Sequence, residues 1–235
     1  MLSTTVDISL IQDELDKMMS KYYGVKVSVL KERLGIQTNN KASFVELSKK
    51  MLNISSNQIE LYNGRVDSVL KTVRITGMNK PAEAMSFMQV NFQEWLDAPS
   101  WHSSELYQYF SNKVLIFFIY QQYPSGKRVE DDEMTFFRVK AWRMSEYDLE
   151  HGLREVWAEV RRLLEESKLE ITTVTQHSGR KINKNNLPSS KFNELGHLRP
   201  GGKNGDDKIT LPDGQRLVRQ RFWFNSGYVK EIIGM

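Results

Sequence analysis

The stretch Lys113–Gln121 reads KVLIFFIYQ and decides the fold of the chain. An unbroken apolar run lies between a lysine and a glutamine, and it is far shorter than the ~20 apolar residues of a membrane-spanning helix. Such a run is typical of a strand that is buried on both faces of its sheet. The sequence therefore predicts a central strand here.

Three other stretches predict strands around this one. Gln58–Tyr62 and Arg65–Ile75 flank Asn63-Gly64, a dipeptide that commonly forms the two-residue turn of a hairpin. Thr135–Ala141 reads TFFRVKA and follows a polar loop at Tyr123–Asp132. Together these stretches predict a mixed sheet.

Apolar residues at helical spacing predict helices beside the strands. The first fifty residues contain three such runs, and Gly24 and Gly35 end the first two. The clearest helix spans Asp148–Lys168 and has a continuous apolar stripe. Ser145, with Asp148 three residues later, resembles a capping box at its start.

The last third of the chain has fewer apolar runs. Residues 172–208 are rich in loop-forming residues, and a strand through Gln215–Phe224 is followed by a short helix or turn from Ser226 to Ile233. We expect an α/β (α+β) fold with a core sheet flanked by helices. We also expect a helical N-terminal arm over residues 1–40 and one domain over residues 41–235.

Composition excludes several classes of function. The chain has no cysteine, which excludes disulfides, thiolate zinc sites and cysteine nucleophiles. His102, His151, His177 and His197 lack the spacing of metal ligands, so surface or hydrogen-bonded roles are simpler. Nucleotide-binding glycine fingerprints and a serine elbow are also missing. The first ten residues do not resemble a secretory signal, and we expect a cytoplasmic location.

Positive charge is concentrated at the C-terminal end. Residues 171–235 contain 11 Lys and Arg against 5 Asp and Glu, whereas the whole chain has a net charge of only +4. This asymmetry favours a polyanionic partner such as nucleic acid. A basic surface that is simply solvated is the alternative.

A glycine-rich loop lies within this basic region, where residues 196–205 read GHLRPGGKNG. Arg199 is followed by Pro200, and an arginine in such a loop can form a bidentate contact with guanine. Lys203 is a candidate phosphate contact, and the glycines allow close approach of the backbone. An ordinary surface loop with a salt-bridged arginine explains the same composition.

The strand that follows combines arginines with aromatic residues. In a strand, Arg219, Arg221 and Trp223 share one face, while Phe222 and Phe224 share the other. The first face predicts a basic and aromatic strip that is suited to DNA. The alternative is that Trp223 covers the edge of the core.

The string LRPGGKNGDDKITLPDGQRLVRQRFWFNSGYVKEII, residues 198–233, resembles the C-terminal recognition segment of MutH-like endonucleases, which act at GATC. The shared pattern is L-R-P, a Gly/Asn/Lys loop, a T-L-P-x-G turn, and a basic aromatic strand before a terminal helix. Weaker similarity at Glu83–Phe87, Glu94–Trp101 and Lys113–Tyr120 extends the resemblance over roughly Phe44 to Ile233. It implies a restriction-endonuclease-like core, and the Sau-three-A type of restriction enzyme is the more similar branch. It also implies which residues contact DNA, namely His197, Arg199, Pro200, Lys203, Arg219, Arg221 and Trp223.

The resemblance also implies where a nuclease site would lie. Family members that cleave use a D-x(n)-E-x-K cluster that holds Mg²⁺. The family strand V-E-L-K-T corresponds to residues 68–72, SVLKT, so Lys71 matches the lysine and Val69 replaces the glutamate. The aspartate position falls near Tyr62, and Glu46 matches a helical glutamate. Asp67 is a possible substitute ligand, because it shares a strand face with Val69 and Lys71.

This degenerate cluster resembles the C-terminal, effector-binding half of the Sau-three-A type enzymes. The resemblance implies a non-catalytic domain that binds GATC duplexes, with no cofactor of its own. Mg²⁺ and cleavage would belong to a MutH-like catalytic domain in the same or an adjacent polypeptide. Two alternatives stay open: a complete Mg²⁺-dependent endonuclease with a migrated metal site, and a non-enzymatic DNA-binding regulator.

Overall fold

The computed structural model describes residues 7–38, 42–61, 66–122, 129–175, 177, 179 and 181–235. The chain folds into two compact units. Unit 1 comprises Met1–Glu83, Asn112–Met144 and Lys230–Met235, and unit 2 comprises Ala84–Ser111 and Ser145–Val229. The predicted turn at Asn63-Gly64, most of the loop at Tyr123–Asp132, and Tyr62 lie outside the described residues.

Unit 1 contains a four-stranded mixed sheet. Its strands, in spatial order, are β1 (Gln58–Leu61), β2 (Val66–Ile75), β4 (Val114–Gln121) and β5 (Thr135–Trp142). β2 and β4 run parallel, whereas the two outer pairs are antiparallel. Every residue of β4 from Val114 to Tyr120 is buried, which confirms the predicted central strand. The mixed α/β class is therefore confirmed at this level.

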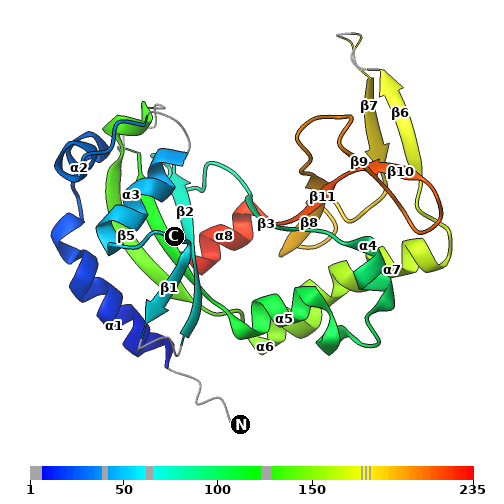
Figure 1. Ribbon diagram of the computed structural model, residues 1–235, viewed down its shortest axis with the longest axis horizontal. Helices are drawn as coiled ribbons and strands as arrows, with labels where there is room; N and C mark the ends of the chain where they lie inside the picture. The colour runs from blue at the N-terminus through cyan, green and yellow to red at the C-terminus, as the bar shows by residue number, and fades with distance from the viewer. Residues whose placement is uncertain are drawn as a thin grey trace. The chain divides into compact units, whose positions relative to one another are not determined.

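Three helices cover one face of this sheet: α1 (Ile8–Met19), α2 (Val27–Leu34) and α3 (Ala42–Leu52) (Figure 1). Asp7 caps α1 by accepting a hydrogen bond from the Ser9 amide, and Gly35 ends α2 in the left-handed region at φ 67°. Apolar side chains of all three helices share one core with β1, β2, β4 and β5. The predicted separate arm over residues 1–40 therefore does not coincide with the observed division, because these helices form part of the core of unit 1.

Unit 2 contains a three-stranded antiparallel sheet with β11 (Gln220–Phe224) between β3 (Met85–Gln89) and β8 (Gly196–Pro200). Phe222 and Phe224 are fully buried, as the alternation of the strand predicts. The predicted strand over Gln215–Phe224 is divided into β10 (Arg216–Val218), which pairs with β9 (Lys208–Thr210), and β11. The break falls at Arg219. The predicted terminal helix is α8 (Ser226–Ile232).

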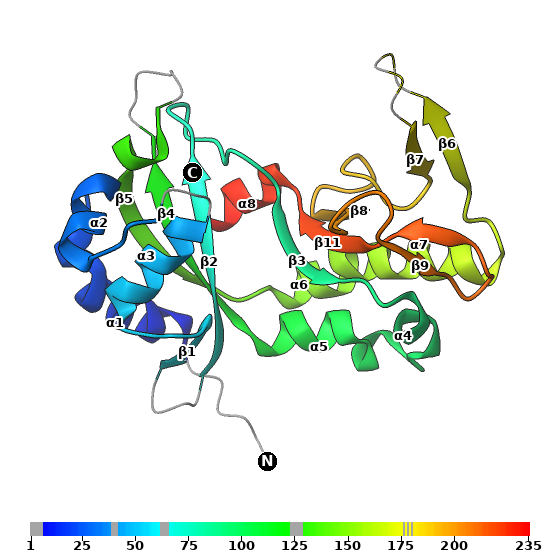
Figure 2. The same cartoon turned by 45° about the horizontal axis from the view of Figure 1, so that its top comes forward.

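The helical part of unit 2 consists of α4 (Phe92–Asp97), α5 (Glu105–Asn112), α6 (Glu146–Asp148) and α7 (Arg154–Glu165). Figure 2 shows α7 alongside the sheet of β3, β11 and β8. Ser145 accepts a hydrogen bond from the Asp148 amide at 3.0 Å, so the predicted N-cap is present. A π-helical turn at Leu149–Leu153 connects α6 to α7 and interrupts the predicted continuous helix.

A hairpin occupies part of residues 172–208, for which composition predicts loops. β6 (Ile171–Thr175) pairs with β7 (Lys181–Asn185) in antiparallel register. The β-branched sequence ITTVT of β6 favours a strand, but none of its residues is fully buried, so it lacks the apolar alternation on which the prediction depended.

Among the described residues, no helix combines the length and the apolar character that crossing a membrane requires.

Candidate nucleic-acid interface

The antiparallel pairing of β8 with β11 brings the predicted DNA-binding residues onto one face of unit 2. Arg199 is the register partner of Arg221, and His197 is the partner of Trp223. Residues directly opposite each other in such a pair project to the same face. The other face carries Leu198 and the buried phenylalanines of β11. We call the first face, with Arg199, Arg221 and Trp223 as its accessible members, the basic face.

Arg199 and Trp223 form the centre of the basic face. The Arg199 side chain is exposed, and its guanidinium carbon lies 4.6 Å from the centroid of the half-buried Trp223 ring. The two residues are diagonal neighbours across the strand pair, a spacing that long side chains can bridge. A cation–π contact of this kind contributes ~0.5–1 kcal/mol at an exposed site and favours the stacked orientation of the arginine.

Arg221 holds the strands together beneath this stack. Its Nη1 donates to the Phe87 carbonyl at 3.0 Å, and its Nε donates to the Gly201 carbonyl at 3.4 Å. A Cβ at position 201 would lie 2.3 Å from the Arg221 Cγ, so the close approach requires glycine there. Arg221 therefore positions the loop, and Arg199 is the arginine that is better placed to contact a ligand.

The loop after β8 is organised by Asp207. Its carboxylate accepts hydrogen bonds from the Lys203 amide at 3.0 Å and from the Arg219 Nε at 2.8 Å. These donors lower the pKa of Asp207, with the backbone amide of Lys203 as the largest cause. Lys203 has its side chain exposed at this loop, and exposed Pro200 precedes it at the end of β8. The predicted contact residue Arg219 is thus paired with Asp207 within the loop.

His197 projects to the same side of the sheet as the basic face but is only 5% exposed. Its Nδ1 and the Asn225 Oδ1 are 2.5 Å apart, and the Asn225 amide nitrogen donates to the Asn193 carbonyl at 2.8 Å. Asn193 in turn donates to the Gly152 carbonyl in the π-helical turn at 2.9 Å. This chain of polar groups fixes β8 relative to the helix that follows Ser145. His197 was predicted among the DNA-binding residues, and its burial gives it a positioning role.

We expect His197 to make the stability of the chain depend on pH. Burial lowers its pKa below 6.5, and the positive charge of Arg199 lowers it further, although the bond to Asn225 acts in the opposite direction. The unfolded state therefore takes up the proton first, so the free energy of unfolding should be fully present above pH 6.5 and fall as the pH decreases below it. The slope should be at most about 1.4 kcal/mol per pH unit.

Urea unfolding between pH 7.5 and 5.8 measures this slope, and His197→Gln should make it shallower. An identical slope in the variant would contradict the assignment. His102, which is exposed and lies 2.9 Å from Glu150, provides the matched control through His102→Gln.

The predicted remnant of a nuclease site is only partly assembled in unit 1. Asp67, Val69 and Lys71 share one face of β2. Leu70 projects to the other face and packs in the same core as α3. Glu46 is on α3 and accepts a hydrogen bond from the Thr38 hydroxyl at 2.7 Å. Since α3 packs on the Leu70 face of β2, Lys71 projects to the face opposite α3. The Asp67 carboxylate lies 2.6 Å from the Lys113 ammonium. Tyr62 lies outside the described residues.

Within the described ranges, there is no group of three or more His, Asp or Glu side chains with the geometry of a metal site. The sequence did not predict the polar residues that organise the candidate interface, which are Asn193, Asp207 and Asn225. Asn and Asp side chains commonly accept hydrogen bonds from backbone amides nearby in the chain, as Asn193 does from the Leu195 amide at 3.1 Å, so their residue types were the available signal. Comparison of the chain with protein-family models and with curated proteins finds no match.

Proposed function

We propose that unit 2 binds duplex DNA at a specific sequence, and that this sequence is GATC, as the resemblance to MutH-like recognition segments implies. The observation that supports the proposal is the stack of exposed Arg199 on Trp223 beside a loop that presents Lys203. A stacked arginine is pre-oriented for a bidentate contact to guanine O6 and N7. An exposed lysine in a glycine loop suits the adjacent phosphates.

In this proposal the chain recognises DNA, and cleavage is carried out by a MutH-like catalytic domain elsewhere in the same or a neighbouring polypeptide. Valine at position 69 cannot ligate Mg²⁺, and the nearby carboxylate of Asp67 is engaged with Lys113. Mg²⁺ would then belong to the cleaving partner. A regulator that binds DNA without any nuclease partner would use the same basic face, and only the presence of a catalytic copy distinguishes the two.

A mobility-shift titration tests the proposal directly. The chain should bind a GATC duplex more tightly than a duplex with the four bases scrambled, because only base contacts distinguish the two. Affinity for both should fall linearly on a logarithmic plot as salt rises, since phosphate contacts release counterions. Lys203→Ala should weaken both duplexes alike and reduce that slope by about 1. Equal affinity for the two duplexes at physiological salt would remove the claim of specificity.

A further inference from the structure

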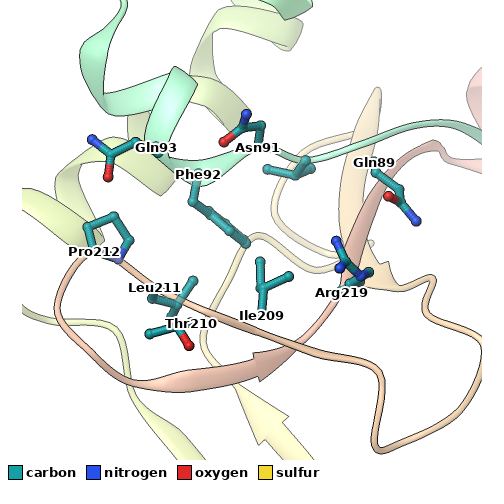
Figure 3. A pocket seen from close by; sticks show the side chains of 10 residues that line it. Gln89, Asn91, Phe92, Gln93, Ile209, Thr210, Leu211, Pro212 and Arg219 are labelled. Atoms are coloured by element: carbon teal, nitrogen blue, oxygen red, sulfur yellow. The ribbon is translucent and has the colours of Figure 1, made fainter.

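A pocket of about 450 Å³ opens in unit 2 next to the basic face. One wall is Gln89–Gln93, where β3 passes into α4, and the opposite wall is Ile209–Pro212, where β9 passes into a turn. Arg219 completes the lining (Figure 3). We call this the β3–β9 pocket. Pockets of this size accommodate small organic groups.

The floor of the β3–β9 pocket is apolar. Figure 3 shows the Phe92 ring extending from α4 toward Ile209 and Leu211 of the opposite wall. Phe92 and Leu211 are almost fully buried, so this floor is packed and preformed. An apolar floor of this kind favours an apolar ring face over a strongly charged group.

Amide side chains surround this floor and offer both donors and acceptors. The Asn91 Oδ1 accepts from the Glu94 amide at 3.2 Å, and its nitrogen remains for a ligand. The Gln93 amide nitrogen donates to Asp97 at 2.8 Å, and its oxygen remains. Gln89 is exposed at the rim. Amides of this kind pair with the edges of nucleobases, and adenine offers the matching donor and acceptor.

The pocket is continuous with the basic face through Gln89. Gln89 is the register partner of Arg221 on β3, and Arg221 is the partner of Arg199 on β8. Three neighbouring strands place the two ends of this row ~10 Å apart. A duplex that contacts Arg199 would therefore bring nearby nucleotides within reach of the pocket.

We propose that the β3–β9 pocket receives one base of the bound duplex, turned out of its stack, and that adenine is the preferred base. This inference rests on the proposed DNA binding. The base lies on the Phe92 floor, and the amides of Gln89, Asn91 and Gln93 contact its edge. Turning a base out costs least where its pairing is already weak, so the affinity of the chain should depend on the pairing of that base.

The test uses GATC duplexes with 2-aminopurine, a fluorescent adenine analogue, in place of the adenine. Fluorescence should rise when the chain binds, because the analogue leaves the stack. A mismatch opposite the adenine should tighten binding about ten-fold, since less pairing energy is lost. Thr210 is an exposed residue of the pocket wall, and Thr210→Phe should fill the pocket and abolish both effects.

Thr172→Phe is the matched control, because it adds the same ring to an exposed strand position outside the pocket lining. It should behave as the wild type. Gln89→Ala removes only an exposed amide and should reduce the mismatch effect, which keeps the test informative if Thr210→Phe folds poorly. A duplex that is bound, as judged by mobility shift, without a rise in fluorescence would overturn the pocket assignment alone. Failure to bind any duplex would overturn the proposed function together with it.

Discussion

Replacing Arg199 by alanine is expected to lower the preference of the chain for GATC over a scrambled duplex by ~1–3 kcal/mol, a factor of ~5–150. The Arg199 guanidinium is exposed and stacked on Trp223, so it is the pre-oriented donor of the basic face. Its loss should remove a base contact and leave most phosphate contacts in place. Competitive mobility shifts with the two duplexes at one salt concentration measure the ratio.

Two variants separate this effect from a general loss of charge. Arg154→Ala removes an exposed arginine of α7 that pairs with Glu150, away from the basic face, and should leave the ratio unchanged. Trp223→Phe keeps a ring under Arg199 and should retain much of the preference. If Arg199→Ala binds both duplexes with the wild-type ratio, then Arg199 does not read bases, and the basic face acts only through its charge.

The second prediction with a large expected effect is that the chain alone does not cleave DNA. The chain alone, incubated with GATC-containing plasmid and Mg²⁺ or Mn²⁺, is expected to leave the DNA uncut. Hydrolysis by MutH-like endonucleases, which the chain resembles in sequence, requires carboxylates that converge on a metal beside a lysine. Without the metal, both the activated water and the stabilisation of the transition state are lost. The resemblance assigns Val69 to the glutamate position. Glu46 is on α3, which packs on the Leu70 face of β2, whereas Val69 and Lys71 project to the opposite face.

The Asp67→Ala variant distinguishes a chain that cannot cleave DNA from one whose metal site has moved to Asp67. Specific nicking by the wild type that disappears in Asp67→Ala would establish Asp67 as a metal ligand and refute the non-catalytic assignment. Asp97→Ala, which changes a carboxylate on α4, serves as the control for nonspecific loss. Cutting that appears only when a MutH-like catalytic domain is added would support a division of labour between recognition and hydrolysis.

Local sequence patterns predicted those parts of the fold in which the burial pattern lies within one strand or one helix. The apolar run of β4 and the alternation of Phe222 and Phe224 each depend on one strand, and the structure confirms both. Gly35 ended its helix where the sequence indicated. In each case a short window contains the whole signal, because hydrophobic periodicity follows directly from the geometry of the element.

The division into two units could not be predicted in the same way. Unit 1 is completed by a segment after Asn112 and by the last six residues, Lys230–Met235. Such closure depends on contacts between residues that are distant in the chain, as does the link from Asn193 to Gly152. The proposed recognition residues were identified by resemblance and composition. Only the register of β8 on β11 shows that the arginine that lies against Trp223 is Arg199.

The π-helical turn at Leu149–Leu153 has a consequence for how this protein tolerates insertions and deletions. Such a turn contains one residue more than the α-helical turn that it replaces. Deleting one residue there would restore a regular helix, but it would rotate the segment capped by Ser145 by about 100° relative to Val156 and Trp157. The Gly152 carbonyl would also turn away from Asn193. Natural relatives should therefore vary freely in the length of exposed loops while keeping the residue count of this turn unchanged.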